Sequence, residues 1–162
     1  MYKVAIITAS DKGYVGERED KSGSVIEEIV TAHELEVTGK VILPDDRQML
    51  SDQMLNYCHQ GIDLILTTGG TGFSKRDVTP EATADIVERR ADNLTFAMIA
   101  NSLQYTPKAM LSRGIAGIRE NTLIVNLPGS PKAVRENLEY AIDAIIHGVK
   151  ILKGDDAECA RK

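Results

Sequence analysis

Short runs of aliphatic residues recur along the chain and predict buried β-strands. The runs are Val4–Ile7, Leu35–Leu43, Leu64–Thr67, Ile115–Ile118 and Thr122–Val125. A continuous apolar run such as Val4–Ile7 is typical of a strand that is covered on both faces. Only the polar residues Arg119–Asn121 separate the last two runs, so we expect a tight turn between two short strands.

Between these runs, apolar residues recur every three or four positions, which predicts helices with one buried face. The predicted helices are one after Ser22 or Ser24 (either serine can cap it), one across Leu50–Cys58, one from Pro80 towards Arg90, one within Leu94–Gln104 and one after Pro131. Thr79 is the expected N-cap of the third helix, and Ser130 that of the last. We expect Gly13–Lys21 to be a flexible loop and His147-Gly148 to loosen the last helix.

Strands and helices alternate with short connections, which indicates an α/β fold. We expect a three-layer αβα arrangement with a mainly parallel central sheet, because parallel strands need crossover helices on both faces. At 162 residues the chain suits one domain with one core. The prediction is therefore a single domain over residues 1–162, with 154–162 as a frayed tail.

Polar and glycine residues follow four of the predicted strands. They are Ser10-Asp11, Asp45-Asp46, Thr68–Gly72 and Pro128–Ser130. Parallel strands bring their carboxyl ends to one edge of the sheet, where α/β proteins bind ligands. We therefore expect these four segments to meet in one binding site.

The stretch from Leu64 to Ala82 has the features of an anion-binding corner. Its buried strand ends in small residues that present backbone N–H groups without a Cβ in the way. Thr79-Pro80-Glu81 then begins a helix, whose N-terminus attracts negative charge. The known phosphate motifs do not fit, since Arg76 follows Lys75 where a P-loop needs serine or threonine, and Lys75 stands where a dinucleotide fingerprint needs glycine.

Asp45 and Asp77 lie in or beside this predicted anion site and indicate a cation. Two like charges about 4 Å apart repel by roughly 4 kcal/mol at an effective dielectric constant near 20, which exceeds what a helix dipole returns. Mg²⁺ removes the conflict because it is commonly held by one or two carboxylates and substrate phosphates. Phosphoryl or nucleotidyl transfer is the reaction class that follows. Capping of the next helix by Asp45 or Asp46 explains that acidic pair equally well.

Composition narrows the classes of partner. The net charge of −5 and the 4% aromatic content argue against a nucleic-acid surface. No apolar stretch approaches the roughly 20 residues of a membrane span, and no signal peptide is visible. The distant Cys58 and Cys159 suit free thiols in the cytoplasm, and the three histidines lack the spacing of a zinc site.

Several of these segments together resemble the MogA/MoaB family of molybdenum-cofactor biosynthesis proteins, most closely the MogA-type molybdopterin adenylyltransferases. The matching segments are Leu43–Asp46, Thr67–Gly72, Arg76–Ala82, Leu111–Arg113 and Leu127–Pro131. The resemblance implies an α/β fold, usually trimeric, that transfers AMP from Mg-ATP to the terminal phosphate of molybdopterin and releases pyrophosphate. It also implies a MoeA-like metal-insertion protein as the partner that receives the adenylated product.

The resemblance also assigns residues to the site. Asp45 and Asp77 match the family's catalytic and metal-binding acidic positions. The other binding residues that it implies are Ser10, Asp11, Thr68, Gly69, Gly70, Thr71, Gly72, Ser112, Pro128, Gly129 and Ser130. Ser112 and the adjacent Arg113 match a segment at the edge of the site, and an ordinary cap and a surface salt bridge explain them nearly as well.

Two other functions remain open. A MoaB-like protein would bind or carry molybdopterin without catalysis, although the presence of both aspartates counts against it. A nucleotide-pyrophosphate hydrolase, as in domains related to competence-damage proteins, is the third possibility. Such domains usually belong to longer chains than this one of 162 residues.

Overall fold

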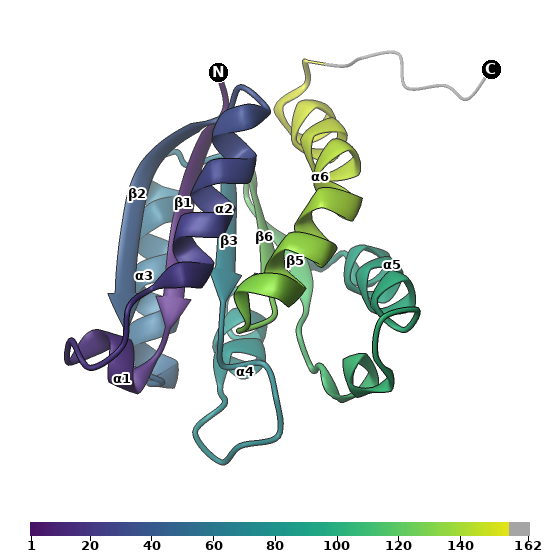
Figure 1. Cartoon of the computed structure of the whole chain (residues 1–162). Helices are drawn as coiled ribbons and strands as arrows, with labels where there is room; N and C mark the ends of the chain where they lie inside the picture. The colour runs from purple at the N-terminus through teal and green to yellow at the C-terminus, as the bar shows by residue number, and fades with distance from the viewer. Residues whose placement is uncertain (156–162) are drawn as a thin grey trace.

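A mainly parallel sheet of six strands forms the middle layer of the computed structural model, which describes residues 1–155 (Figure 1). The strands are β1 (Lys3–Ala9), β2 (Glu36–Leu43), β3 (Leu64–Thr68), β4 (Arg89–Arg90), β5 (Ala116–Arg119) and β6 (Thr122–Leu127). Their order is β2-β1-β3-β6-β5-β4; the first four are parallel, and β5 and β4 complete the sheet as antiparallel strands. The predicted three-layer α/β fold is confirmed.

Helices cover both faces of this sheet. They are α1 (Asp11–Tyr14), α2 (Lys21–Ala32), α3 (Arg47–His59), α4 (Thr79–Ala84), α5 (Asp92–Ser102), the 3-10 helix η1 (Pro107–Leu111) and α6 (Pro131–Lys153). Alternate residues of β1 point to opposite sides: Ile6 packs with α2, α5 and α6, whereas Ile7 packs with α3 and α4. The sheet therefore lies between two apolar layers, as the continuous apolar runs predict.

The strand predictions agree closely with the structure. The run Leu35–Leu43 becomes β2 from Glu36 onward, and β5 and β6 form the expected antiparallel pair around a short turn. The strand that the pattern missed is β4, because two exposed arginines carry no apolar signal.

Several predictions about the first helices were wrong. Gly13–Lys21 is not entirely loop, since α1 covers Asp11–Tyr14. Neither Ser22 nor Ser24 caps α2; Asp20 does, and its carboxylate accepts a hydrogen bond of 2.8 Å from the Gly23 amide. A carboxylate three residues before a helical amide is as good a cap as a serine, so the pattern fitted both positions.

The predictions for the later helices were wrong in detail. The third predicted helix ends at Ala84 instead of continuing towards Arg90. Thr79 is its first helical residue and not its N-cap; the N-cap is Val78, and no side chain makes a capping hydrogen bond there. Helix α6 runs unbroken through His147-Gly148 and ends where Gly154 takes the left-handed conformation. The rest of the expected tail, 156–162, lies outside the described residues.

Candidate functional site

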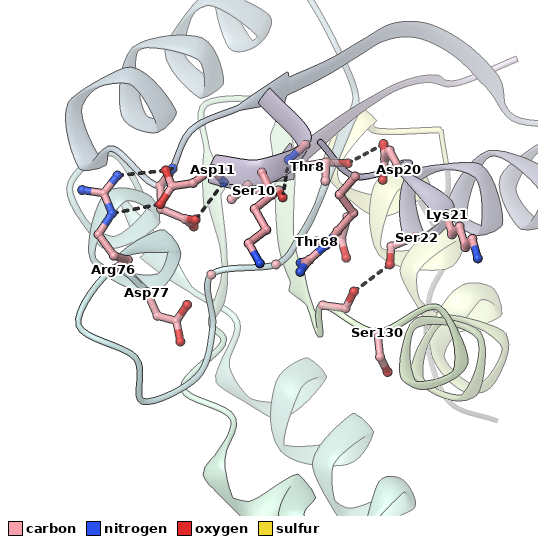
Figure 2. A pocket seen from close by; sticks show the side chains of 18 of the residues that line it. Thr8, Ser10, Asp11, Asp20, Lys21, Ser22, Thr68, Arg76, Asp77 and Ser130 are labelled. Atoms are coloured by element: carbon pink, nitrogen blue, oxygen red, sulfur yellow. Dashed lines mark hydrogen bonds and ion pairs between the residues drawn. The ribbon is translucent and has the colours of Figure 1, made fainter. Parts of the chain in front are cut away.

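A cavity of about 910 Å³ opens at the carboxyl ends of β1, β2, β3 and β6 (Figure 2). All four predicted segments reach it. The predicted site residues that line it are Ser10, Asp11, Asp45, Thr68, Gly69, Gly70, Asp77, Gly129 and Ser130. The parallel order of these strands is the reason that segments so distant in the sequence meet here.

Asp11 joins the end of β1 to both neighbouring segments of the site. Its carboxylate accepts two hydrogen bonds from the Arg76 guanidinium, at 2.9 and 3.0 Å, and one of 3.0 Å from the Asp45 amide (Figure 2). The Asp11 amide in turn donates to the Asp45 carboxylate at 3.3 Å. Hydrogen bonds from Arg76 hold the pKa of Asp11 below its ordinary value. Asp11 is therefore a charged, structural member of the site.

Asp45 presents an unpaired oxygen within the site. Its neighbour Asp46 caps α3 by accepting from the Met49 amide at 2.9 Å, which settles the capping question in favour of Asp46. Oδ1 of Asp45 is buried and has no hydrogen-bond partner among residues 1–155. Burial, followed by the charges of Asp11 and then of Asp77, raises the pKa of the Asp45 carboxyl. A buried carboxylate oxygen without a donor is costly, and a bound cation would relieve that cost.

The glycine stretch allows the chain to approach the other strand ends closely. Gly69 and Gly70 have φ of +86° and +69°, in the left-handed region. A Cβ on Gly69 would lie 2.4 Å from the Ala9 carbonyl oxygen. A Cβ on Gly70 would lie 2.3 Å from Thr79 Oγ1 and 3.0 Å from Asp45 Oδ1. Only glycine leaves the space beside Asp45 open.

Thr79 adds a second buried oxygen at the same point. Its side chain is fully buried, and its Oγ1, like Asp45 Oδ1, has no partner. Both oxygens face the small space that a side chain on Gly70 would fill. Sequence reasoning treated Thr79 as a helix cap and missed this position, since nothing in the sequence places it beside Asp45.

Asp77 lies at the end of an exposed loop and borders the cavity (Figure 2). Its Oδ2 accepts one hydrogen bond, of 3.0 Å, from the Ser74 amide. Asp77 is close enough to Asp45 for its charge to raise the pKa of the Asp45 carboxyl. The two carboxylates therefore face one cavity, as the sequence predicts.

The N-terminus of α6 forms the opposite side of the cavity. Ser130 caps this helix by accepting from the Ala133 amide at 3.2 Å, as predicted. The Ser22 hydroxyl at the start of α2 donates to the Gly129 carbonyl at 2.7 Å and joins the two helix starts. Thr68 holds the same turn through a bond of 2.6 Å to the Pro128 carbonyl.

Three cations that the sequence analysis did not single out also line the cavity. They are Lys12, Arg18 and Lys21, and no ion pair is found for them within residues 1–155. By contrast, Arg76 is paired with Asp11. Lys12 and Lys21 adjoin Asp11 and Asp20, so only the fold reveals that they share a cavity with the glycine stretch.

The remaining predicted residues lie along a second, smaller cavity of about 320 Å³. Thr71, Gly72, Ser112 and Pro128 line it, together with apolar residues of α5, η1 and α6. Ser130 lines both cavities. The predicted site residues thus line two adjoining cavities, which meet at Ser130 before the start of α6.

The site suits Mg²⁺ bound together with a phosphorylated ligand. Among residues 1–155, no three His, Cys, Asp or Glu side chains are grouped as a metal cluster. Mg²⁺ does not need such a cluster, because it usually keeps several waters and takes one or two carboxylates plus substrate phosphates. Asp45, with its unpaired buried oxygen, and Asp77 fit that requirement.

These features are typical of one class of protein, the α/β proteins that bind phosphorylated small molecules at the carboxyl edge of the sheet. The sequence model of a family described as "Probable molybdopterin binding domain" matches residues 5–147. The chain belongs to this family, whose members include MogA and MoaB proteins.

Comparisons with individual relatives support this family assignment. A molybdopterin adenylyltransferase of Helicobacter pylori is 38% identical over 155 residues, which are 94% of this chain and 88% of that protein. Gephyrin of Dictyostelium discoideum is 41% identical over 92% of this chain, which spans only 22% of gephyrin. The crystal structure of a molybdopterin biosynthesis enzyme MoaB from Thermus thermophilus superposes with a TM-score of 0.90 at 42% identity, and covers 95% of this chain and 98% of that one.

Proposed function

We propose that the protein is a molybdopterin adenylyltransferase, an enzyme of molybdenum-cofactor biosynthesis that uses molybdopterin and ATP. A terminal phosphate oxygen of molybdopterin attacks the α-phosphorus of ATP, a new P–O–P bond forms, and the bond to the β-phosphate breaks. Adenylated molybdopterin and pyrophosphate are the products. The observation that carries the proposal is Asp45, which lines the same cavity as Asp77 and two helix starts and whose buried Oδ1 has no hydrogen-bond partner among residues 1–155.

The protein's own groups have distinct tasks in this reaction. When bound, Mg²⁺ would be held by Asp45 and Asp77 and would offset the negative charge of the triphosphate and of the leaving pyrophosphate. The amides beside Gly69 and Gly70 and the start of α6 bind phosphate oxygens. Lys12 and Lys21 meet the departing pyrophosphate. Positioning and neutralisation of charge supply the catalysis, so no protein nucleophile is needed.

The decisive experiment follows AMP transfer from ATP to molybdopterin in the presence and absence of Mg²⁺. The wild-type protein should turn over only with the metal. Asp77→Ala should lower kcat by on the order of 100-fold or more while the protein remains folded, because it removes a group that stabilises charge in the transition state. A wild type without activity, or an active Asp77→Ala variant, would contradict the proposal.

The alternative is a carrier that binds molybdopterin without turnover. The solved MoaB structure that this chain resembles is described as a biosynthesis enzyme, which favours the enzyme over such a carrier. Isothermal titration separates them: a carrier binds molybdopterin but neither binds nor consumes Mg-ATP. Release of AMP from ADP-ribose, without molybdopterin, would instead indicate a pyrophosphate hydrolase.

We also propose a homotrimer that acts in the cytoplasm and passes its product to a MoeA-like metal-insertion protein. Large apolar side chains stay exposed on and after α5, where Phe96 is 71% and Met110 64% exposed, and they offer a surface for contact between copies. No helix within residues 1–155 is long and apolar enough to span a membrane. Light scattering after gel filtration tests the trimer.

A further inference from the structure

Arg113 makes an unusual number of contacts with one loop. Its Nε donates to the Gly72 carbonyl at 2.7 Å and its Nη2 to the Asp77 carbonyl at 2.8 Å. Its Nη1 pairs with the Glu81 carboxylate, and its own amide donates to the Thr71 carbonyl at 2.8 Å. One arginine from the segment before β5 therefore contacts the residues at both ends of the loop 72–77.

The loop 72–77 has few other attachments. Within it, the Asp77 amide donates to the Ser74 carbonyl at 2.9 Å and the Ser74 amide donates to the Asp77 carboxylate. Outside it, the ion pair between Arg76 and Asp11 has side chains that are 64% and 42% exposed. This ion pair is more exposed than the pair between Arg113 and Glu81 and is therefore more strongly screened by water, so Arg113 is the better-shielded restraint on the loop.

The chemistry of these contacts requires arginine. The planar guanidinium carries several N–H donors in fixed directions and satisfies two carbonyls and a carboxylate at once. Lysine has a single ammonium and keeps at most part of this set. The Arg113 and Glu81 side chains are each 35% exposed, so the contacts are only partly screened by water.

We propose that Arg113 is a positioning residue that fixes Asp77 by joining the two ends of its loop. In the part of the chain that the structure describes, the Asp77 side chain has one hydrogen bond, from Ser74 in the same loop, and none to the strands of the sheet. The backbone of Asp77 is held instead, through its carbonyl, by Arg113. The inference rests on the proposed function only for the claim that the position of Asp77 matters to AMP transfer.

The first test measures the loop without any reaction. Amide hydrogen exchange, read by mass spectrometry, is compared between the wild type and Arg113→Lys and Arg113→Met. We expect the amides of Ser74 and Asp77, which are hydrogen-bonded within the loop, to exchange roughly tenfold faster in both variants, because local opening governs exchange. Amides of β3 and β6 should be unchanged, which shows that the variants fold.

Arg119→Lys is the matched control. Arg119 is another half-buried arginine, the last residue of β5, and its Nη1 donates to a backbone carbonyl, that of Ile86, at 3.1 Å. It does not contact the loop 72–77 in the described residues. The control should lower thermal stability to a similar extent but leave exchange in the loop unchanged.

The second test separates positioning from general stability. Arg113→Lys should lower kcat for AMP transfer about 100-fold, since a displacement near 1 Å has that effect, and should change KM for ATP less than about threefold. Arg119→Lys should keep kcat. Unchanged loop exchange in both Arg113 variants would overturn the inference, as would a faster loop with an unchanged kcat. If the wild type transfers no AMP, the proposed function fails, while the exchange result still decides whether Arg113 holds the loop.

Discussion

Substitution of Gly70 by alanine tests whether the space beside Asp45 is functional. The added Cβ would lie 2.3 Å from Thr79 Oγ1 and 3.0 Å from Asp45 Oδ1, and the residue has φ of +69°. Gly61 offers a matched control, since it has φ of +77° with no atom within 4 Å of its added Cβ. The two substitutions share backbone strain, and only one fills the space.

The expected loss of stability is larger for Gly70→Ala than for Gly61→Ala. An L-residue in the left-handed region costs about 1 kcal/mol at either glycine. Overpacking adds about 1–3 kcal/mol at Gly70 alone. For a chain of this size, 1 kcal/mol lowers Tm by about 2–4 °C. We therefore expect Gly61→Ala to lower Tm by about 2–4 °C and Gly70→Ala by about 4–16 °C.

Two measurements check this expectation. Thermal unfolding gives the Tm of each variant, and isothermal titration with ATP gives its affinity with and without Mg²⁺. Gly61→Ala should retain the increase in affinity that Mg²⁺ gives, whereas Gly70→Ala should lose it even at temperatures where it is folded. If both variants lose the same stability and bind Mg-ATP equally well, the space beside Asp45 holds nothing of importance.

Three further predictions concern single side chains. Asp45→Asn should be more stable than the wild type at pH 7, because burial raises the pKa of the Asp45 carboxyl and the folded protein therefore disfavours its charged form; this difference should disappear as the pH falls below 3.8, and urea unfolding across pH measures it. Ser130→Ala removes the acceptor of the Ala133 amide and should cost about 1 kcal/mol, seen as a lower Tm. Asn126→Ala removes the acceptor of the buried Ile115 amide and should cost about 2–3 kcal/mol in urea unfolding.

The sequence predicts the strands well because a strand that is buried on both faces consists almost entirely of apolar residues. Val4–Ile7 and Leu64–Thr67 have few polar residues and became central strands. Helix starts were predicted less well, since Asp20 and Ser22 both fit a cap and only tertiary contacts decide between them. The strand β4 left no signal in the sequence, because its two exposed arginines join the sheet through backbone pairing with β5.

The sequence predicted that the site residues come together at one edge of the sheet, but it did not predict the contacts that they make there. Strand polarity brings Asp45 and Asp77 to one edge whatever their side chains do. The contacts of Arg113 with the Asp77 loop depend on the path of the segment before β5, which no local pattern encodes. The unpaired Thr79 hydroxyl likewise arises from the close approach of Gly70, a feature of three dimensions alone.

The hydroxyl of Tyr2 donates to the carboxylate of Asp155 at 2.7 Å, so both ends of the described chain lie together (Figure 1). This junction is at the amino edge of the sheet, across the molecule from the cavity mouth. The chain therefore enters its first strand and leaves its last helix on the side of the molecule opposite the cavity. The fold is consequently well suited to incorporation as a module of a larger multifunctional protein, with its chemistry undisturbed by whatever is joined to it.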